Sequence, residues 1–387
     1  MFIPRNILEP LRQLKGKYPL LALTGPRQSG KTTLLQAAFP DYQYVSLENA
    51  DVRERAVQDP NAFLEKYAGK VFFDEVQRAP QLFSYLQTKT DSDRTMGQYI
   101  LSGSQNFLLL ESISQSLAGR VALLKLLPFS FSELAAAGLL ANSWQEAAFK
   151  GFYPAIFDRH IEPVDFYPNY LETYIERDVR NLVAVRDLRQ FRLFLKRCAG
   201  HTGQLLNLLS LANDCGISSP TAKAWLSVLE SSYIVFTLSP YYRNFNKRLV
   251  KTPKLFFYDT GLVCNLLEMD DPGDVDNYFQ RGSLFENFIV AEMYKQAFHQ
   301  GRRPSFYFWQ DSNKNEIDLL WEKASTLHLM EIKSGQTVNA SFFHNLEKFT
   351  AASGQTIGHR YLAYGGTEGF SQQGIEVLGW QAVQELE

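Results

Sequence analysis

The stretch of sequence that decides the fold covers residues 25–33 and reads Gly25-Pro26-Arg27-Gln28-Ser29-Gly30-Lys31-Thr32-Thr33. It matches the P-loop pattern G-x-x-x-x-G-K-[ST] position by position. The glycines allow the backbone to curl so that successive N–H groups point at phosphate oxygens, and a helix beginning near Lys31 adds its positive end. Lys31 should reach the β- and γ-phosphates, and the Thr32 hydroxyl should ligate Mg²⁺. The stretch therefore predicts a site for a nucleoside triphosphate with magnesium.

The flanking segments predict a parallel α/β sheet around this loop. A short apolar run at residues 18–24 suits a buried strand, and residues 31–39 suit a helix that Pro40 ends. Further candidate strands lie at residues 42–47, 71–73 and 99–102, with helical stretches between them. This alternation is typical of βαβ units.

Two acids follow the candidate strand at residues 71–73, in the run Val71-Phe-Phe-Asp74-Glu75. Asp74 is expected to hold the magnesium shell, and Glu75 to polarise the attacking water. Apolar strands often end in acids, but this strand follows a P-loop at a suitable distance. Glu75 also has no obvious structural partner in the sequence. The pair therefore favours hydrolysis over binding alone.

The next candidate strand ends in a polar tip, Ser102-Gly-Ser104-Gln-Asn106. Ser104 or Asn106 is a candidate sensor that hydrogen-bonds the γ-phosphate. A polar cap between a strand and a helix explains the same spacing equally well. Both interpretations stay open.

Length and composition restrict the classes of function. A chain of 387 residues favours two or three domains. With a net charge of −2, the chain has no overall electrostatic field that would indicate binding to nucleic acid or to a membrane. Cys198, Cys215 and Cys264 lack metal-type spacing and fit no disulfide framework. Without a signal pattern or a long apolar run, the expected location is the cytoplasm, with no membrane partner.

The middle of the chain predicts a helix-turn-helix followed by a wing-like hairpin. The helices are expected at residues 205–211 and 220–229, and the hairpin strands at 233–238 and 254–258. Basic residues, interleaved with Tyr241, Tyr242 and Phe245, are Arg243, Lys247, Arg248, Lys251 and Lys254. Such a mixture suits a nucleic-acid backbone. A winged helix for structural or protein contact, with a solvated basic edge, is the other interpretation.

Acids recur near the C-terminus at spacing that can bring them together. Glu286 lies in an expected helix at residues 283–298, Asp318 in a strand, and Glu331 with Lys333 in the next strand. Residues two apart in a strand face the same side. Three carboxylates with a lysine suit a second divalent metal and phosphodiester hydrolysis. Because Glu-x-Lys is also common at strand edges, a purely structural role stays open.

Several of these motifs occur together in one known family. They are residues 25–32, 73–77, 101–104, Ser116-Leu-Ala-Gly-Arg120, Leu127-Pro-Phe-Ser-Phe131, Gly151-Phe-Tyr-Pro154, residues 170–178, 253–261, Gly282-Ser-Leu-Phe-Glu286 and Glu331-Ile-Lys333. Over nearly its whole length the chain resembles the AAA-type ATPases of bacteria and archaea that carry a C-terminal DUF4143 domain. The resemblance implies ATP as the nucleotide and an AAA-like core with an additional strand. It also makes Arg120 a candidate arginine finger or sensor, in cis or from a neighbour in an oligomer.

The C-terminal part resembles the PD-(D/E)xK nuclease fold, whose pattern is an acid followed by Glu-x-Lys. That likeness implies that Tyr307 and Trp309 lie on the first core strand. Members of this superfamily often keep the fold after losing cleavage, so nuclease activity stays open.

Together, these features predict an α/β protein of three parts. They are a parallel-sheet, AAA-like P-loop ATPase domain at 1–160, a helical winged helix-turn-helix region at 161–270, and a restriction-endonuclease-like α/β domain at 271–387. The predicted function is magnesium-dependent ATP binding and hydrolysis that controls the attached modules on DNA or RNA. The alternative is a nucleotide-dependent scaffold or signalling ATPase that binds a protein partner, with a catalytically silent C-terminal domain.

Overall fold

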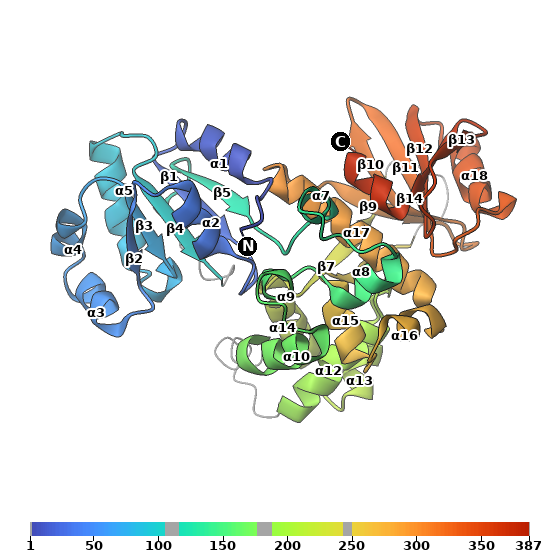
Figure 1. Cartoon of the computed structure of the whole chain (residues 1–387), viewed down its shortest axis with the longest axis horizontal. Helices are drawn as coiled ribbons and strands as arrows, with labels where there is room; N and C mark the ends of the chain where they lie inside the picture. The colour runs from blue at the N-terminus through green and yellow to red at the C-terminus, as the bar shows by residue number, and fades with distance from the viewer. Residues whose placement is uncertain (1, 105–115, 176–187, 243–249, 387) are drawn as a thin grey trace.

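The computed structural model describes residues 2–104, 116–175, 188–242 and 250–386. The chain forms a smaller lobe from its N-terminal part and a larger lobe from the rest (Figure 1). The smaller lobe contains a five-stranded sheet in the order β2-β3-β4-β1-β5, and all its pairings are parallel. Its strands are β1 (Leu20–Thr24), β2 (Gln43–Ser46), β3 (Val71–Asp74), β4 (Tyr99–Gly103) and β5 (Val121–Lys125). The predicted parallel α/β sheet is confirmed, with β5 as a strand that was not predicted.

Helices cover both faces of this sheet, so all residues of β1 and β4 are buried. These helices are α1 (Leu8–Lys15), α2 (Lys31–Ala38), α3 (Ala50–Gln58), α4 (Pro60–Lys66) and α5 (Leu82–Ser92), with a 3₁₀ turn η1 (Val76–Arg78). Leu21 and Leu23 share a core with α1 and α2. Leu20 and Ala22 face the opposite core, with α3, α4 and α5. This alternation follows from the two-residue period of a strand.

The change from the small core to the large core lies near Leu126, earlier than the expected boundary at residue 160. Leu127 and Phe129 already belong to the large core. The following helices are α7 (Phe131–Ala136), α8 (Trp144–Lys150), α9 (Pro154–Asp158), α10 (Pro163–Tyr170) and the π-helical η2 (Leu171–Ile175). Trp144 of α8 packs against Phe285 of the C-terminal part, with ring centroids 4.9 Å apart. Residues 127–160 therefore pack with the larger lobe.

The predicted helix-turn-helix and hairpin are present in the larger lobe. In chain order the elements are α12 (Leu188–Gly200), β6 (Gln204–Leu205), α13 (Leu208–Asp214), α14 (Ser219–Ser231), β7 (Val235–Pro240) and β8 (Lys254–Phe257). The Ser218 side chain caps α14 by accepting from the Thr221 amide at 3.2 Å. Strand β8 pairs antiparallel with both β7 and β6. Together these elements form a winged-helix arrangement.

The C-terminal part continues the same sheet. Its elements are α15 (Thr260–Leu266), α16 (Pro272–Asn277), α17 (Arg281–His299), β9 (Phe306–Gln310), β10 (Glu316–Lys323), β11 (Thr326–Lys333), η3 (Ala340–Phe343), α18 (His344–Ser353), β12 (Ile357–Tyr364), β13 (Phe370–Gln372), β14 (Ile375–Gly379) and η4 (Trp380–Glu385). The nine strands follow the order β13-β14-β12-β11-β10-β9-β7-β8-β6. Because β7 pairs with β9 in parallel, one sheet continues across the expected domain boundary at residue 270. Tyr307 and Trp309 lie on β9 as expected.

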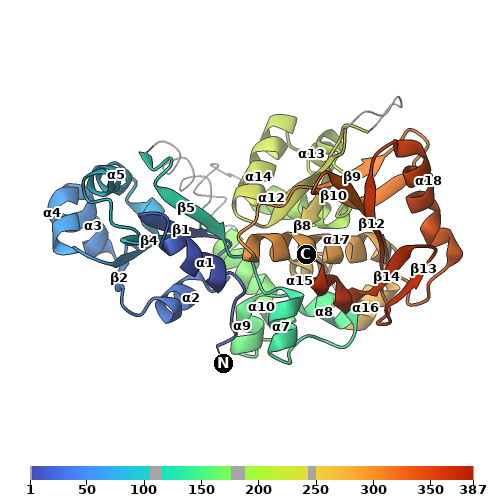
Figure 2. The same ribbon diagram turned by 90° about the horizontal axis from the view of Figure 1, so that it is seen from above.

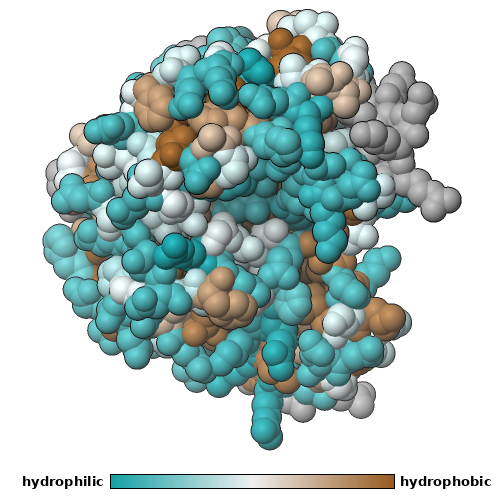
Figure 3. Space-filling model, turned by 90° about the vertical axis from the view of Figure 1, so that its right-hand side faces the viewer, coloured by the Kyte–Doolittle hydropathy of each residue, from teal (hydrophilic) through white to brown (hydrophobic). Residues whose placement is uncertain are grey.

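Helix α17 runs along the larger lobe, with one end beside the smaller lobe (Figure 2). The exposed face in Figure 3 is mostly hydrophilic, and hydrophobic side chains form small separate patches on it. Within the described ranges, none of the helices has the length and apolar character needed to cross a membrane.

Candidate functional site

The loop at residues 25–33 joins the end of β1 to the start of α2. Gly25 has φ 151°, and a Cβ atom there would collide with the carbonyl oxygen of Leu126. Gly30 precedes α2 in the left-handed region, with φ 89°. Both positions therefore require glycine. The first turn of α2 leaves its backbone N–H groups without intrahelical acceptors, which makes this a potential anion site.

The Lys31 side chain folds over the loop that precedes it. Its Nζ donates to the carbonyl oxygens of Gly25 at 2.9 Å and Pro26 at 2.7 Å. The ammonium group is therefore held against the loop. A pocket of about 250 Å³ lies beside Gly30 and Thr33, and the N-terminal segment with Phe2 and Ile3 forms its other wall.

Thr32 and Asp74, which the sequence predicts as magnesium ligands, lie in direct contact. The Thr32 hydroxyl donates to Asp74 Oδ2 at 2.9 Å. Tyr44 donates to the same oxygen at 3.1 Å, and the Ser102 hydroxyl donates to Asp74 Oδ1. Sequence reasoning missed Tyr44 and Ser102, although a serine inside an otherwise apolar strand was an available signal. The fold thus brings an oxygen pair suited to Mg²⁺ to the loop.

Glu75 lies beside the predicted sensor, Ser104. Its Oε2 accepts from Ser104 Oγ at 3.2 Å and from Gln77 Nε2 at 2.5 Å. The expectation that Glu75 lacks a structural partner is therefore wrong, because η1 places Gln77 next to it. Glu75 itself has a left-handed backbone, with φ 55°. Gln105 and Asn106 lie outside the described residues.

Arg120 lies at the N-terminal ends of the parallel strands, whereas the loop lies at their C-terminal ends. Its carbonyl oxygen accepts from Leu20 N at the start of β1, whereas the loop follows the end of β1 at Thr24. Its guanidinium contacts Asp91 with Nε at 2.5 Å and Nη2 at 2.9 Å. The expectation that Arg120 acts in cis is therefore corrected. Only the role in a neighbouring copy stays a prediction.

Arg5 connects the loop to the larger lobe. It is 5% exposed, and it donates to the carbonyl oxygens of Ser29 at 2.9 Å and Leu127 at 2.6 Å. Its Nε lies 3.1 Å from Glu133 Oε2, and His299 Nδ1 lies 3.3 Å from the other oxygen of Glu133. Burial opposes the ionisation of Glu133, but the Arg5 guanidinium and the hydrogen bond from the His299 ring outweigh it and lower the pKa of this carboxyl. Burial also lowers the pKa of His299, which favours a neutral ring that accepts from Leu127 N at 3.2 Å.

A second polar cluster lies between α17 and β10. Carboxylate oxygens of Glu286, Glu316 and Asp318 lie within 4.8 Å of one another. We refer to these three residues as the acidic cluster. Glu316 was missed, although it precedes Asp318 by two positions and so faces the same side of the strand. Oxygen ligands of this kind suit hard divalent cations.

Glu331, the third acid expected from the sequence, lies beside the acidic cluster and contacts Lys333. Lys333 Nζ is 2.7 Å from Glu331 Oε1 and 3.3 Å from Asp318 Oδ2. Asn345 also donates to Glu331 Oε1, at 3.2 Å. Glu331 Oε2 is buried without a hydrogen-bond partner in the described part of the chain. Burial raises the pKa of both Glu331 and Glu286.

Lys254, expected in a basic run that either contacts nucleic acid or forms a solvated edge, is instead buried on β8. Its Nζ lies 2.7 Å from Glu286 Oε1 and also contacts Glu316. Burial opposes the charge of Lys254, but Glu286 and Glu316 raise its pKa overall. Lys251 is exposed, as expected, whereas Arg243, Lys247 and Arg248 lie outside the described residues.

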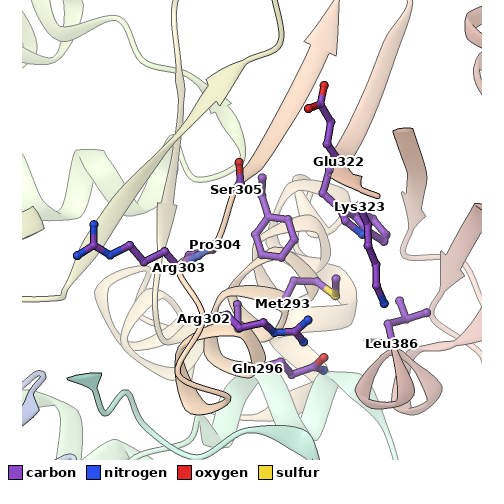
Figure 4. A pocket seen from close by; sticks show the side chains of 12 residues that line it. Met293, Gln296, Arg302, Arg303, Pro304, Ser305, Glu322, Lys323 and Leu386 are labelled. Carbon is purple, nitrogen blue, oxygen red and sulfur yellow. The ribbon is translucent and has the colours of Figure 1, made fainter. Parts of the chain in front are cut away.

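A separate pocket lies between the end of α17 and strands β9 and β10 (Figure 4). Arg302 and Lys323 approach it from two sides, while Glu322 and Arg303 point away. None of the predicted site residues lines this pocket.

Known families account for most of the chain. Residues 17–135 match the family described as AAA domain, residues 141–273 match DUF8612, a domain of unknown function, and residues 281–383 match DUF4143, also a domain of unknown function. The fold and the loop define the class as P-loop ATPases. Within this class, the chain is an AAA-type ATPase with a C-terminal DUF4143 domain.

The chain is also similar to individual proteins and solved structures. An uncharacterized protein of Mycobacterium tuberculosis is 28% identical over 342 residues, which cover 87% of this chain and 75% of that protein. An uncharacterized protein of Haemophilus influenzae is 21% identical, over 77% of this chain and 80% of its own length. A Walker-type ATPase of Pyrococcus abyssi has a TM-score of 0.42 at 16% identity, over 69% of this chain and 96% of its own. AMPPCP-bound DnaA from Aquifex aeolicus has a TM-score of 0.30 at 18% identity, over 58% of this chain and 85% of its own.

Proposed function

We propose that the chain binds ATP with Mg²⁺ at residues 25–33 and hydrolyses it. The observation that carries this proposal is the 2.9 Å contact between Thr32 Oγ1 and Asp74 Oδ2. These residues come from α2 and β3 and form an oxygen pair at the mouth of the loop. A magnesium ion held there neutralises phosphate charge. Gly25 to Thr33 supply the cradle, and Lys31 supplies a cation for the β- and γ-phosphates.

Glu75 is the residue that we propose as the base for the attacking water. Ser104 donates to its carboxylate at 3.2 Å and so holds the base at the edge of the sheet. A γ-phosphate that draws the Ser104 hydroxyl toward itself would release this contact. Ser104 would then act as a sensor by changing the position of Glu75. ATP rather than GTP remains an inference from the family.

Replacing Lys31 with alanine tests nucleotide binding. Titration of the full chain with ATP and Mg²⁺ should show loss of binding in Lys31→Ala. Lys17→Ala, at an exposed position two residues after α1, is the matched control. If a correctly folded Lys31→Ala protein kept its ATP affinity, the proposed site would be wrong.

We further propose that the nucleotide cycle of the smaller lobe controls the winged-helix and C-terminal parts of the larger lobe on DNA or RNA. The winged-helix arrangement and the acidic cluster support this extension. Comparing ATP hydrolysis with and without single- and double-stranded DNA tests it. A protein scaffold, with a silent C-terminal part, is favoured if Lys247→Ala and Arg248→Ala leave nucleic-acid binding unchanged.

The acidic cluster supports metal-dependent nuclease activity as a second candidate function. Glu286, Glu316 and Asp318 would hold the metal, and Glu331 Oε2, which is buried without a hydrogen-bond partner among the described residues, is a further oxygen close to them. A divalent cation would activate water and neutralise the scissile phosphate. Cleavage that requires Mg²⁺ or Mn²⁺ and disappears in Asp318→Ala is the expected result. Absence of cleavage of any DNA or RNA under these conditions would refute it.

A further inference from the structure

A lysine from the winged-helix hairpin reaches into the acidic cluster of the C-terminal part. Lys254 lies on β8, where it pairs with Leu238 of β7 and Leu205 of β6. Its side chain is 5% exposed. Glu286 belongs to α17 and Glu316 to β10, so the contact joins three elements that are distant in sequence.

Two lysines divide the acids between them. Lys333 contacts Glu331 and Asp318, while Lys254 contacts Glu286 and Glu316. The four carboxylates carry two more charges than the two ammonium groups when all are ionised. One divalent cation would balance this excess, which is costly to bury unpaired.

Lys254 holds the oxygens that such a cation needs. A magnesium ion binds carboxylate oxygens at about 2.1 Å and manganese prefers the same hard oxygen ligands. With Lys254 Nζ only 2.7 Å from Glu286 Oε1, metal and ammonium would be neighbours on one oxygen. In a buried site their repulsion is screened far less than in water. Simultaneous binding of the divalent metal and the Lys254 ammonium group to Glu286 is therefore unfavourable.

We propose that Lys254 is the resident cation of the acidic cluster and competes with a divalent metal for Glu286 and Glu316. The winged-helix hairpin thereby lowers the metal affinity of the C-terminal part. This inference rests on the metal site proposed above. It assigns Lys254 a role separate from nucleic-acid contact.

Calorimetric titration of the nucleotide-free full chain with Mn²⁺ tests the competition. Lys254→Met should bind Mn²⁺ at least about tenfold more tightly than the natural chain, because removal of a buried like charge favours the metal. Adding Glu286→Gln to Lys254→Met should abolish the gain. Lys251→Met, an exposed lysine just before β8, should leave the affinity unchanged.

A thermal measurement gives a second readout. Lys254→Met leaves carboxylates unpaired, so its melting temperature should fall and then recover with Mn²⁺ more than that of the natural chain. If Lys254→Met does not fold, Lys254→Gln, which also removes the charge of the lysine but keeps a polar side chain and all three carboxylates, replaces it in both experiments.

The outcomes separate the two proposals. Equal or weaker Mn²⁺ binding by the variant, with binding by the natural chain, overturns the competition but leaves the metal site standing. No Mn²⁺ binding by either protein overturns both, and ATP binding at the P-loop is unaffected by that result.

Discussion

Arg5 Nη2 lies 3.4 Å from His299 Nε2, although the two residues are 294 positions apart in the sequence. The same guanidinium donates to the carbonyl oxygen of Ser29 in the P-loop. His299 is the last residue of α17, whose first turns carry Glu286 of the acidic cluster. One buried cation therefore contacts both the nucleotide-binding loop and the helix that reaches the C-terminal site.

Replacing Arg5 with methionine should weaken both the fold and the loop. Glu133 would remain buried without its main cation, and breaking a buried pair in this way costs about 3–5 kcal/mol. We expect a large fall in the free energy of unfolding and a weaker affinity for ATP, measured by denaturant titration and calorimetry. Arg12→Met, at an exposed position of α1, should change neither. Unchanged stability of Arg5→Met would contradict the importance of this contact.

Gly25→Ala should abolish ATP binding by distorting the loop. The added methyl would collide with the carbonyl oxygen of Leu126, and φ 151° is unfavourable for alanine. Gly282→Ala provides the control, because nothing lies within 4 Å of its added Cβ. Normal ATP binding by Gly25→Ala would show that the loop tolerates a different backbone.

Glu75→Gln should separate binding from hydrolysis. Glutamine keeps the size of the side chain but cannot accept the proton of the attacking water, so kcat should fall by about 10²- to 10⁴-fold. Phosphate release measures the rate, and calorimetry checks that ATP affinity is retained. Glu54→Gln, on the exposed surface of α3, is the control. A rate close to normal would exclude Glu75 as the base.

Glu292 should make stability decrease as the pH rises. Burial raises its pKa from 4.5 to about 8, and Lys295 offsets this only in part. A carboxyl whose folded pKa is raised is most favourable to folding below its unfolded pKa. This contribution is lost between pH 4.5 and about 8. Glu292→Gln should therefore reduce the loss of stability over this range, measured by urea unfolding at several pH values. Glu347→Gln, an exposed acid of α18, should keep the slope of the natural chain, and an unaltered slope in Glu292→Gln would refute the assignment.

The sequence predicts the local features of this protein well. The P-loop, the strand that ends in Asp74 and the helix-turn-helix are each determined by residues that are close together in the sequence. Because alternate residues of a strand face the same side, the run Glu316-Ile-Asp318 also indicates that Glu316 lies beside Asp318 in the acidic cluster. These features needed no knowledge of which segments meet in space.

The remaining features depend on contacts between distant segments. Lys254 follows a run of basic residues, and only its burial against α17 distinguishes it from a solvated lysine. Arg120 precedes β5, which was not predicted. Because β5 is parallel to β1, the start of β5 lies at the end of the sheet away from the P-loop. Recognising Val121–Lys125 as a strand would therefore have excluded a role for Arg120 in cis. Arg5 carries no motif at all.

The pairing between β7 and β9 determines how the chain can be divided for experiments. Ser239 and Pro240 pair with Tyr307 and Phe308, and Tyr241 N donates to the carbonyl oxygen of Phe308 at 2.8 Å. A fragment that contains only residues 281–387 would expose this side of β9, and an unpaired strand edge promotes aggregation. Expression fragments of the larger lobe should therefore begin near residue 127 and keep the hairpin and the C-terminal strands in one polypeptide.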